Sequence, residues 1–357
     1  MRFRLGDLPY NDMEKCNICP RGCGIDRNIN KGFCGEKNTV RLARAALHFW
    51  EEPCISGDKG SGTVFFSGCN LRCVYCQNYG ISRGELGKEV SDERLCEIFF
   101  ELKAQGANNI NLVTPTHFSL QIKRVVAEAK AKGLDLPIVW NTGGYEKAEM
   151  IASLDKTVDI YLTDFKYMSG ELAEKYSAAK DYPETAKEAL SEMVRTKGAP
   201  VVRNGLMKKG VIVRHLVLPG CVSDSLRIMD YLHSEYGDDI IISIMSQFTP
   251  DKKHLVNYPE LCRKLTEYEY SKVVDYADKI GISLAYVQEG SAAKESFIPD
   301  FDYTGVEFSL PKNTEGTSPI ITVSAIQISV SVSTSTVEIS SIAVILTFTE
   351  SVILCRL

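Results

Sequence analysis

The chain has 357 residues, of which 44% are hydrophobic and 24% are charged, and this composition excludes a disordered or fibrous protein. Its 41 Lys and Arg residues against 46 Asp and Glu residues give a net charge of −5, so we expect no nucleic-acid or anionic-membrane partner. Its apolar runs are only strand-sized, and residues 1–15 contain no apolar export core. We therefore expect a cytoplasmic protein without a membrane span.

Cysteine usage points to metal chemistry near the start of the chain. Twelve cysteines in a protein without an export signal are more typical of metal ligands or free thiols than of disulfides. Eight of them lie in the first 76 residues, namely Cys16, Cys19, Cys23, Cys34, Cys54, Cys69, Cys73 and Cys76.

From residue 63 onward, short apolar runs alternate with amphipathic stretches. The runs that we expect to form strands are 63–67, 110–113, 137–141, 159–164, 211–218, 239–245 and 282–287. The helices expected between most of them are 91–105, 119–132, 146–154, 184–197, 223–236 and 260–280. Strands rich in Val and Ile that alternate with helices predict a parallel sheet buried on both faces. Six such units favour an α/β fold with a partial (β/α)6 TIM-like barrel.

The regions on either side of this barrel differ from it in composition. Residues 1–62 are rich in Gly and Cys and predict an N-terminal Cys-rich cap, in which 39–50 fits either a helix or a strand. We expect the barrel itself over 63–306. The tail over 311–357 is low in charge and rich in Ser, Thr, Val and Ile, which predicts a low-complexity, β-prone extension without a role in the chemistry.

Three cysteines follow the first expected barrel strand closely. The string GCNLRCVYCQN places Cys69, Cys73 and Cys76 where the carboxyl ends of barrel strands form active sites. Zinc and ordinary ferredoxin clusters take four protein ligands, so three cysteines without a local fourth leave one iron of a [4Fe–4S] cluster open to another ligand. A structural zinc completed by Cys96 or His117 is an alternative, and free buried thiols are another.

The CNLRCVYC stretch resembles the cluster motif of radical S-adenosylmethionine (radical SAM) enzymes, including Tyr75 before the last cysteine. The wider string over 51–82 is similar to the branch related to pyruvate formate-lyase activating enzyme, and the resemblance extends from about Cys16 to Val306. It implies that S-adenosylmethionine binds the open iron through its amino and carboxylate groups. It also implies reductive cleavage to methionine and a 5′-deoxyadenosyl radical, which abstracts a hydrogen from the substrate.

The resemblance also implies partners. In the activating enzymes the target is a backbone glycine of a glycyl radical enzyme, and an oxygen-labile cluster needs a flavodoxin- or ferredoxin-type electron donor in a reducing cytoplasm. Two alternatives stay open for this chain. One is a radical SAM enzyme that acts on a small molecule or a modified peptide, and the other is a non-catalytic scaffold whose cysteines hold zinc.

Two later motifs match cofactor-binding elements of the family. Asp164 and Lys166 in TDFKY match its D-x-K element, and residues two apart on a strand face the same side. The resemblance implies that Lys166 binds the methionine carboxylate and that Asp164 binds a cation or an ammonium, whereas a solvated ion pair is the alternative. Arg214 in VRHLVLPG matches a cofactor-side arginine, and His215 is expected to face the opposite way as a packing residue.

The NTGGY string at the end of the third expected strand resembles a monovalent-cation site of the activating enzymes. By that resemblance Asn141, Thr142 and Asp164 would hold the cation, together with a carbonyl oxygen from Leu162. Asn141 stands where the family has Asp, which lowers the negative charge of such a site.

The rim of the barrel also departs from the family. Its Gly-Gly-Glu element, which receives the methionine ammonium, is replaced by VTPTH, so Thr114 and Thr116 would have to accept those hydrogen bonds. His117 is a candidate for substrate contact, with packing at a helix cap as an equal alternative. Ser246 or Gln247, after the sixth expected strand, is a candidate contact for the adenosine or the substrate.

The cap carries a second group of cysteines. Cys16, Cys19, Cys23 and Cys34 are separated by two, three and ten residues, with glycines beside them for tight turns. This spacing resembles a structural zinc or rubredoxin-like knuckle, and a second iron–sulfur cluster for electron relay is an alternative. Reduced thiols without a metal are the third possibility, and Cys54 lies outside both groups.

Overall fold

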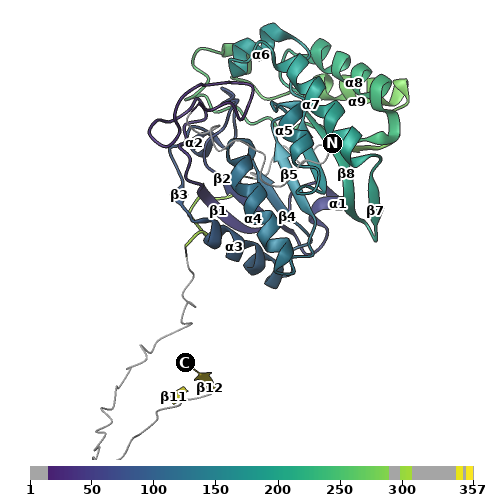
Figure 1. The fold of residues 1–357 in the computed structure, drawn as a ribbon. Helices are drawn as coiled ribbons and strands as arrows, with labels where there is room; N and C mark the ends of the chain where they lie inside the picture. The colour runs from purple at the N-terminus through teal and green to yellow at the C-terminus, as the bar shows by residue number, and fades with distance from the viewer. Residues whose placement is uncertain (1–14, 289–297, 308–342, 349–350, 357) are drawn as a thin grey trace, which may run out of the picture. The chain divides into compact units, whose positions relative to one another are not determined.

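The computed structural model describes residues 15–288, 298–307, 343–348 and 351–356, and the chain divides into two compact units, Met1–Ser309 and Leu310–Leu357. The larger unit is built on one curved sheet with helices around its outside (Figure 1). The order along the sheet is β10-β9-β8-β6-β5-β4-β2-β1-β3, with β7 paired to β8 beside this path.

The strands of this sheet are β1 (Arg41–His48), β2 (Ser61–Phe66), β3 (Lys88–Glu89), β4 (Ile110–Val113), β5 (Ile138–Thr142), β6 (Ile160–Asp164), β7 (Val201–Arg203), β8 (Leu206–Leu216), β9 (Ile241–Met245) and β10 (Ala285–Val287). The helices are α1 (Pro53–Ser56), α2 (Tyr79–Ser82), α3 (Asp92–Ala104), α4 (Ser119–Ala131), α5 (Ala148–Ser153), α6 (Gly170–Ser177), α7 (Tyr182–Lys197), α8 (Val222–Tyr236) and α9 (Glu267–Ile280). Short 3-10 turns are η2 (Thr116–Phe118), η3 (Gly237–Asp239) and η4 (Pro259–Leu261).

Seven neighbouring strands, from β2 through β4, β5, β6, β8 and β9 to β10, pair in parallel. Each pair is joined through at least one helix, which gives the β-α-β alternation of a barrel. The predicted α/β fold with a partial TIM-like barrel is therefore confirmed. Every strand predicted from an apolar run is present, with its ends moved by a few residues.

The two faces of the barrel strands bury different groups. Side chains that face the helices, such as Leu112, Trp140 and Tyr161, belong to the main apolar core. Residues one position away, such as Val139 and Leu162, pack together inside the barrel. This alternation follows from the period of two in a strand, and it decides which polar residues can reach the interior.

Helix α1 closes the end of the barrel at which the strands begin. Ile55 of α1 is fully buried in the interior cluster. Asn109, which precedes β4, donates a hydrogen bond from its amide to the Ile55 carbonyl oxygen at 2.8 Å, and Asn108 does the same to the Ser56 oxygen at 2.6 Å. Residues just before α1 thereby enter the barrel interior from the end at which the strands begin.

The ambiguous stretch over 39–50 contains a strand, β1, that pairs antiparallel with β2. Its Ala-rich sequence has no strong β preference, but pairing with β2 buries Leu42 and Ala43 completely on opposite faces. Part of the predicted cap thus extends the barrel sheet.

The smaller unit contains an antiparallel hairpin of β11 (Ala343–Phe348) and β12 (Ser351–Arg356). The alternating segment over 324–340, on which the β-prone prediction rested, lies outside the described residues. No helix within the described ranges has the length and apolar content needed to cross a membrane.

The turn after β5 supplies a test of the packing between β5 and β6. Gly144 has φ +80°, and a Cβ atom there would lie 2.3 Å from the Asp164 carbonyl oxygen, whereas Gly220 has φ +78° and nothing within 4 Å. Both Ala variants incur the same left-handed strain, but only Gly144→Ala also displaces the backbone of β6. We expect it to lower the free energy of unfolding in urea by about 1–3 kcal/mol more than Gly220→Ala. Equal losses would contradict the described contact.

Candidate active site

The three cysteines of the triplet lie on the loop that leaves the carboxyl end of β2. Gly68 starts this loop with φ +83°, and a Cβ atom there would lie 2.7 Å from the Cys34 carbonyl oxygen, so only glycine fits. Cys69, Cys73 and Cys76 are free cysteines. The thiol of Cys76 lies within electrostatic range of the other two.

The surroundings of these thiols fit an iron–sulfur cluster. The Leu71 N–H points at Cys69 Sγ at 3.4 Å, and the Ser177 hydroxyl points at Cys73 Sγ at 3.0 Å. Such donors stabilise thiolates that bind iron. Burial, followed by the neighbouring thiols, raises the pKa of Cys76 to about 12, so iron would bind there with loss of the thiol proton.

Within the described residues, no group of three or more His, Cys, Asp or Glu side chains is arranged to hold a metal ion as it stands. A [4Fe–4S] cluster takes one thiolate on each of three irons, so its ligands need not converge on a single ion.

Hydroxyl groups extend the environment of Cys73 into the core. Tyr75 and Tyr167 share a hydrogen bond of 2.7 Å between their hydroxyl oxygens, and the Tyr167 hydroxyl lies 2.9 Å from Ser177 Oγ. Burial raises the pKa of both tyrosines well above the usual value, so both hydroxyls are neutral and able to donate. The aromatic residue before the last cysteine is thus linked to Cys73 by a relay of hydroxyl groups.

Asp164 stands between two cations at the carboxyl end of β6. Its carboxylate accepts from Lys166 Nζ at 2.5 Å and from Arg214 Nε at 3.0 Å. Burial opposes its ionisation, but the two cations outweigh burial and hold the pKa of Asp164 below its usual value. Lys166 also lies within electrostatic range of Cys69 and Cys73, so the predicted carboxylate-binding cation stands beside the cysteine triplet.

Arg214 is fully engaged inside the barrel. Besides Asp164, it donates to Glu51 Oε2 at 3.2 Å and to Asn141 Oδ1 at 2.5 Å. Asn111 on β4 donates to Glu51 Oε1 at 2.9 Å. The structure thus joins the predicted residues Asn141, Asp164 and Arg214 in one network around Glu51.

Glu51 and its neighbour Glu52 were missed by the sequence analysis. Both carboxyls reach the barrel interior because α1 closes the barrel at the end where its strands begin. Burial raises the pKa of each of the two carboxyls. Glu52 Oε2 is buried without a hydrogen-bond partner, which favours a neutral acid at this position. The only local signal was a pair of acidic residues directly before Pro53.

Thr116 and Thr142 are brought together at a different carboxyl group. Glu146 Oε1 accepts from the Thr116 hydroxyl at 2.8 Å, from the Thr142 hydroxyl at 2.5 Å and from the Trp140 ring N–H at 3.2 Å. Because Trp140 packs in the core outside the strands, these hydroxyls lie on the helix side of β5, away from the Arg214 network. Thr114 has φ +58° and donates its N–H to the Asn141 carbonyl oxygen at 2.8 Å.

The two histidines near the strand ends act in packing. His215 faces away from the interior, as expected, with its ring nitrogens 2.8 Å from the Phe165 carbonyl oxygen and 2.8 Å from Ser225 Oγ. His117 is buried with Nε2 2.6 Å from the Ser67 carbonyl oxygen. Burial, followed by Arg27, lowers the pKa of His117 to about 3, so its ring is neutral.

Gln247, after β9, lies next to the triplet loop. Its carbonyl oxygen accepts from the Gln77 side chain at 2.6 Å, and Gln77 directly follows Cys76. The Gln247 side-chain oxygen accepts from Gln288 at 3.1 Å, and the Gln288 oxygen accepts from the Ser246 N–H at 2.8 Å.

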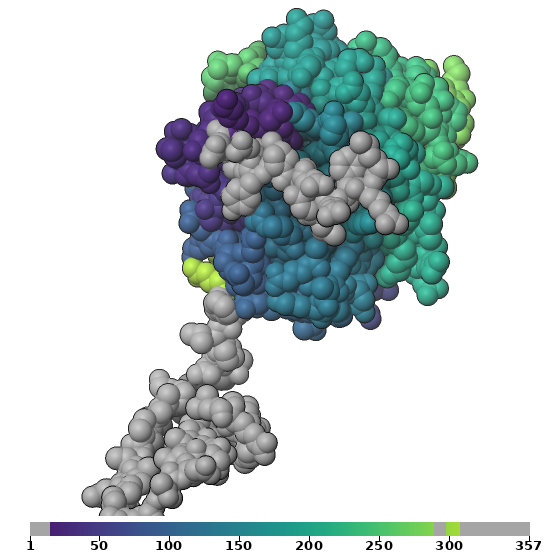
Figure 2. Space-filling model, viewed as in Figure 1, coloured from purple at the N-terminus to yellow at the C-terminus, as the bar shows by residue number. Residues whose placement is uncertain are grey.

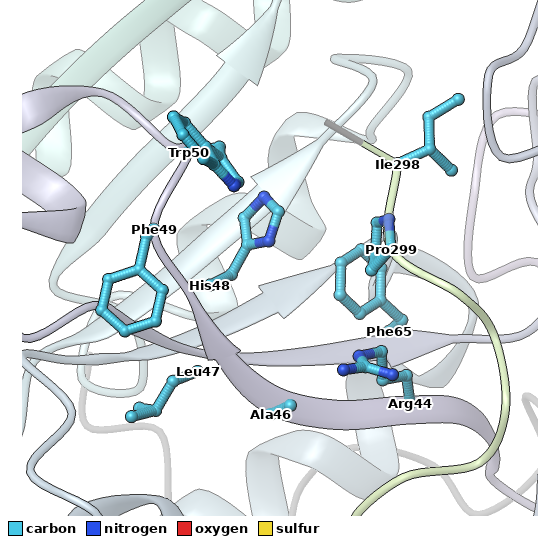
Figure 3. A pocket seen from close by; sticks show the side chains of 9 residues that line it. All are labelled: Arg44, Ala46, Leu47, His48, Phe49, Trp50, Phe65, Ile298 and Pro299. Atoms are coloured by element: carbon cyan, nitrogen blue, oxygen red, sulfur yellow. The ribbon is translucent and has the colours of Figure 1, made fainter. Parts of the chain in front are cut away.

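Two cavities open near these residues. One of about 330 Å³ lies beside Cys76, and its wall includes Tyr79 and His254, whose rings stack at 3.5 Å between centroids. The other, of about 150 Å³, lies at the end of β1, where His48 and Phe65 are among the lining side chains (Figure 3). Ile298 lines both cavities.

Removing the central cation of the interior should be costly. Arg214→Met leaves Glu51 buried without a cation and Asp164 with Lys166 alone, and we expect a loss of about 3–5 kcal/mol in the free energy of unfolding in urea. Arg263→Met, which breaks the surface pair with Glu269, is the matched control and should cost no more than about 1 kcal/mol. Similar losses in the two variants would show that the interior network is not structurally required.

The chain is similar to known proteins in family, sequence and structure. The model of the Radical SAM superfamily matches residues 63–220. Uncharacterized protein MJ0674 of Methanocaldococcus jannaschii is 30% identical over 294 residues, which cover 78% of this chain and 79% of that protein. Uncharacterized protein MJ0808 of the same organism is 24% identical over 262 residues, which cover 67% and 72%.

Among solved structures, Streptococcus suis SuiB bound to its precursor peptide SuiA matches with 14% identity, a TM-score of 0.43, and coverage of 63% of this chain and 48% of SuiB. Methylornithine synthase (PylB) matches with 19% identity, a TM-score of 0.39, and 59% coverage of each chain. The chain thus spans about half the length of the SuiB chain that it matches.

The family match covers the strands from β2 to β8 and includes the cysteine triplet, Asp164, Lys166 and Arg214. Membership of this family implies a [4Fe–4S] cluster and S-adenosylmethionine as cofactors. The protein is a radical SAM enzyme, and the chain belongs to the Radical SAM superfamily.

Proposed function

We propose that Cys69, Cys73 and Cys76 bind the [4Fe–4S] cluster and that S-adenosylmethionine binds beside them for reductive cleavage. The observation that carries this proposal is a set of three free thiols, with donors aimed at two of them, next to the cation Lys166. When bound, such a cluster supplies the electron that splits the sulfonium into methionine and a 5′-deoxyadenosyl radical, which takes a hydrogen from the substrate.

In this proposal, side chains of the protein bind and orient S-adenosylmethionine. Lys166 offers an ammonium group to the methionine carboxylate, and Asp164 keeps Lys166 in place from the other side. Arg214 and Glu51 hold Asp164 at a fixed level of the barrel. Since these four side chains are mostly buried, water has little access to the position that the radical would occupy.

We further propose that the substrate is a peptide segment, namely the backbone glycine of a glycyl radical enzyme. The support is the similarity of 51–82 to the activating-enzyme branch, together with the cavity of about 330 Å³ beside Cys76. Gln77, Thr249 and Asp251 in its wall can hydrogen-bond a peptide backbone, and Tyr79 and His254 offer flat faces to it. A flavodoxin- or ferredoxin-type protein would supply the electron.

The cluster assignment predicts a selective loss. Cys73→Ala should remove about four irons per chain from anaerobically reconstituted protein and abolish the formation of 5′-deoxyadenosine under reduction. Cys96→Ala, a change at another buried free cysteine, should retain both. Iron analysis and product chromatography measure the two effects, and an unchanged cleavage rate in Cys73→Ala would refute the proposal.

The substrate assignment predicts a stable organic radical on a partner protein. Reduced enzyme with S-adenosylmethionine and a co-purified glycyl radical enzyme should give a glycine-centred signal in electron paramagnetic resonance, absent with the Cys73→Ala control. Cleavage of S-adenosylmethionine without any such signal in candidate partners would favour a small molecule or a modified peptide instead.

A further inference from the structure

The proposed function leaves four cysteines of the N-terminal segment unused. Cys16, Cys19 and Cys34 are 6%, 7% and 6% exposed, and Cys23 is partly exposed. All four are free, and the Cys19 thiol lies within electrostatic range of the other three. We call these residues the quartet. Buried thiols gathered in this way, without a disulfide, are the usual state of metal ligands.

Backbone hydrogen bonds fold the segment that carries the quartet into a compact turn. The Cys16 N–H donates to the Ile25 carbonyl oxygen at 2.8 Å, and the Gly24 N–H donates to the Cys16 oxygen at 2.9 Å, which folds the segment back on itself. The Phe33 N–H points at Cys23 Sγ at 3.4 Å, a contact that stabilises a thiolate.

The third and fourth cysteines of the quartet meet at Gly32. A Cβ atom on Gly32 would lie 3.4 Å from Cys34 Sγ and 3.7 Å from Cys23 Sγ, so the two sulfurs flank the same position. Cys34, which is separated from Cys23 by ten residues in the quartet spacing, is thereby brought to it.

A buried arginine gives an independent sign of missing negative charge. Arg27 is fully buried, and its guanidinium donates to the carbonyl oxygens of His117, at 2.5 Å, and Lys37. Among the described residues no carboxylate pairs with it, and its Nε has no hydrogen-bond partner. Cys34 lies within its electrostatic range. A buried guanidinium needs a counter-charge, which neutral thiols do not provide.

We propose that Cys16, Cys19, Cys23 and Cys34 bind a thiophilic metal as a tetrathiolate centre, with Arg27 as its buried counter-cation. Four thiolates around a divalent ion, or around an iron–sulfur cluster, keep a net negative charge, so Arg27 fits both forms. Because no group within the described residues is arranged to hold a metal ion as it stands, the quartet has to close on its metal by side-chain rotation.

The position of the quartet indicates a structural role for the metal centre. The Cys34 carbonyl oxygen accepts the N–H of Cys69 at 3.1 Å, which ties the quartet to the first residue of the triplet. Arg21, between two quartet cysteines, donates to the Asn70 carbonyl oxygen at 2.7 Å and to the Ser177 oxygen at 2.8 Å. The centre therefore holds the triplet loop in place, and residues of the N-terminal segment lie at the molecular surface next to the barrel (Figure 2).

The test begins with full-length protein in which the triplet is removed, Cys69→Ala/Cys73→Ala/Cys76→Ala, purified without oxygen. We expect about one zinc per chain, or iron with matching sulfide, to remain bound. Adding Cys19→Ser and Cys34→Ser should remove that metal, whereas adding Cys54→Ser should leave it. A triplet variant without metal, or a quartet variant that keeps it, overturns the proposal. Since the triplet is absent throughout, the outcome is independent of the proposed function.

If the quartet variant does not fold, Arg27→Met tests the proposed metal centre instead. Loss of a group that supports metal ligands typically weakens metal affinity about 10–100-fold, and competition with a chelator measures this in the triplet variant. An unchanged affinity would overturn the role of Arg27 as counter-cation.

The structural role of the centre in holding the triplet loop can be measured separately. Removing the quartet metal should raise amide hydrogen exchange over 68–76 and leave exchange in α4 unchanged. Equal protection over 68–76 with and without metal would show that the centre does not hold the triplet loop.

Discussion

Charge buried inside a barrel has to be neutralised locally, and in this protein that requirement connects three neighbouring strands of the sheet with the segment before α1. Arg214 on β8 binds Asp164 on β6, Asn141 on β5 and Glu51 from the segment before α1. None of these groups could be buried alone without a large desolvation cost. The network therefore fixes the position of Lys166 beside the cysteine triplet.

The barrel is closed from one end by the same segment that supplies Glu51. α1 places Ile55 in the interior, and the residues before it turn upward into the polar layer. Structure and chemistry are coupled at this point, because a change that loosens α1 also moves a carboxylate that Arg214 needs. The opposite end of the barrel is left to the triplet loop and the cavity beside Cys76.

The parallel strands could be predicted because runs of Val and Ile between amphipathic helices have no other stable arrangement. The triplet could be located because its spacing is local and follows a strand. β1 could not be assigned, since its Ala-rich sequence becomes a strand only through pairing with β2. Glu51 and Glu52 were missed for a related reason, because their place in the interior depends on how α1 folds under the barrel.

The alternation rule could have sharpened one part of the site. Once Asn141 faces the interior, its neighbour Thr142 must face the helices, where Glu146 binds it. The same rule correctly assigned Arg214 to the interior and His215 to packing against α8. The quartet shows what the sequence alone could not provide. Its spacing was visible in the sequence, but the unpaired guanidinium of Arg27 that supports a metal there comes from the fold.

Ser177 connects two parts of the molecule that are otherwise separate in sequence. Its hydroxyl points at Cys73 Sγ, while its carbonyl oxygen is held by Arg21 from between the quartet cysteines. A hydroxyl directed at a cluster sulfur favours the more negative, reduced state of the iron. With the proposed cluster bound at the triplet, its midpoint potential would therefore depend on how firmly the N-terminal segment is folded, and loss of that segment's order would make the cluster harder to reduce.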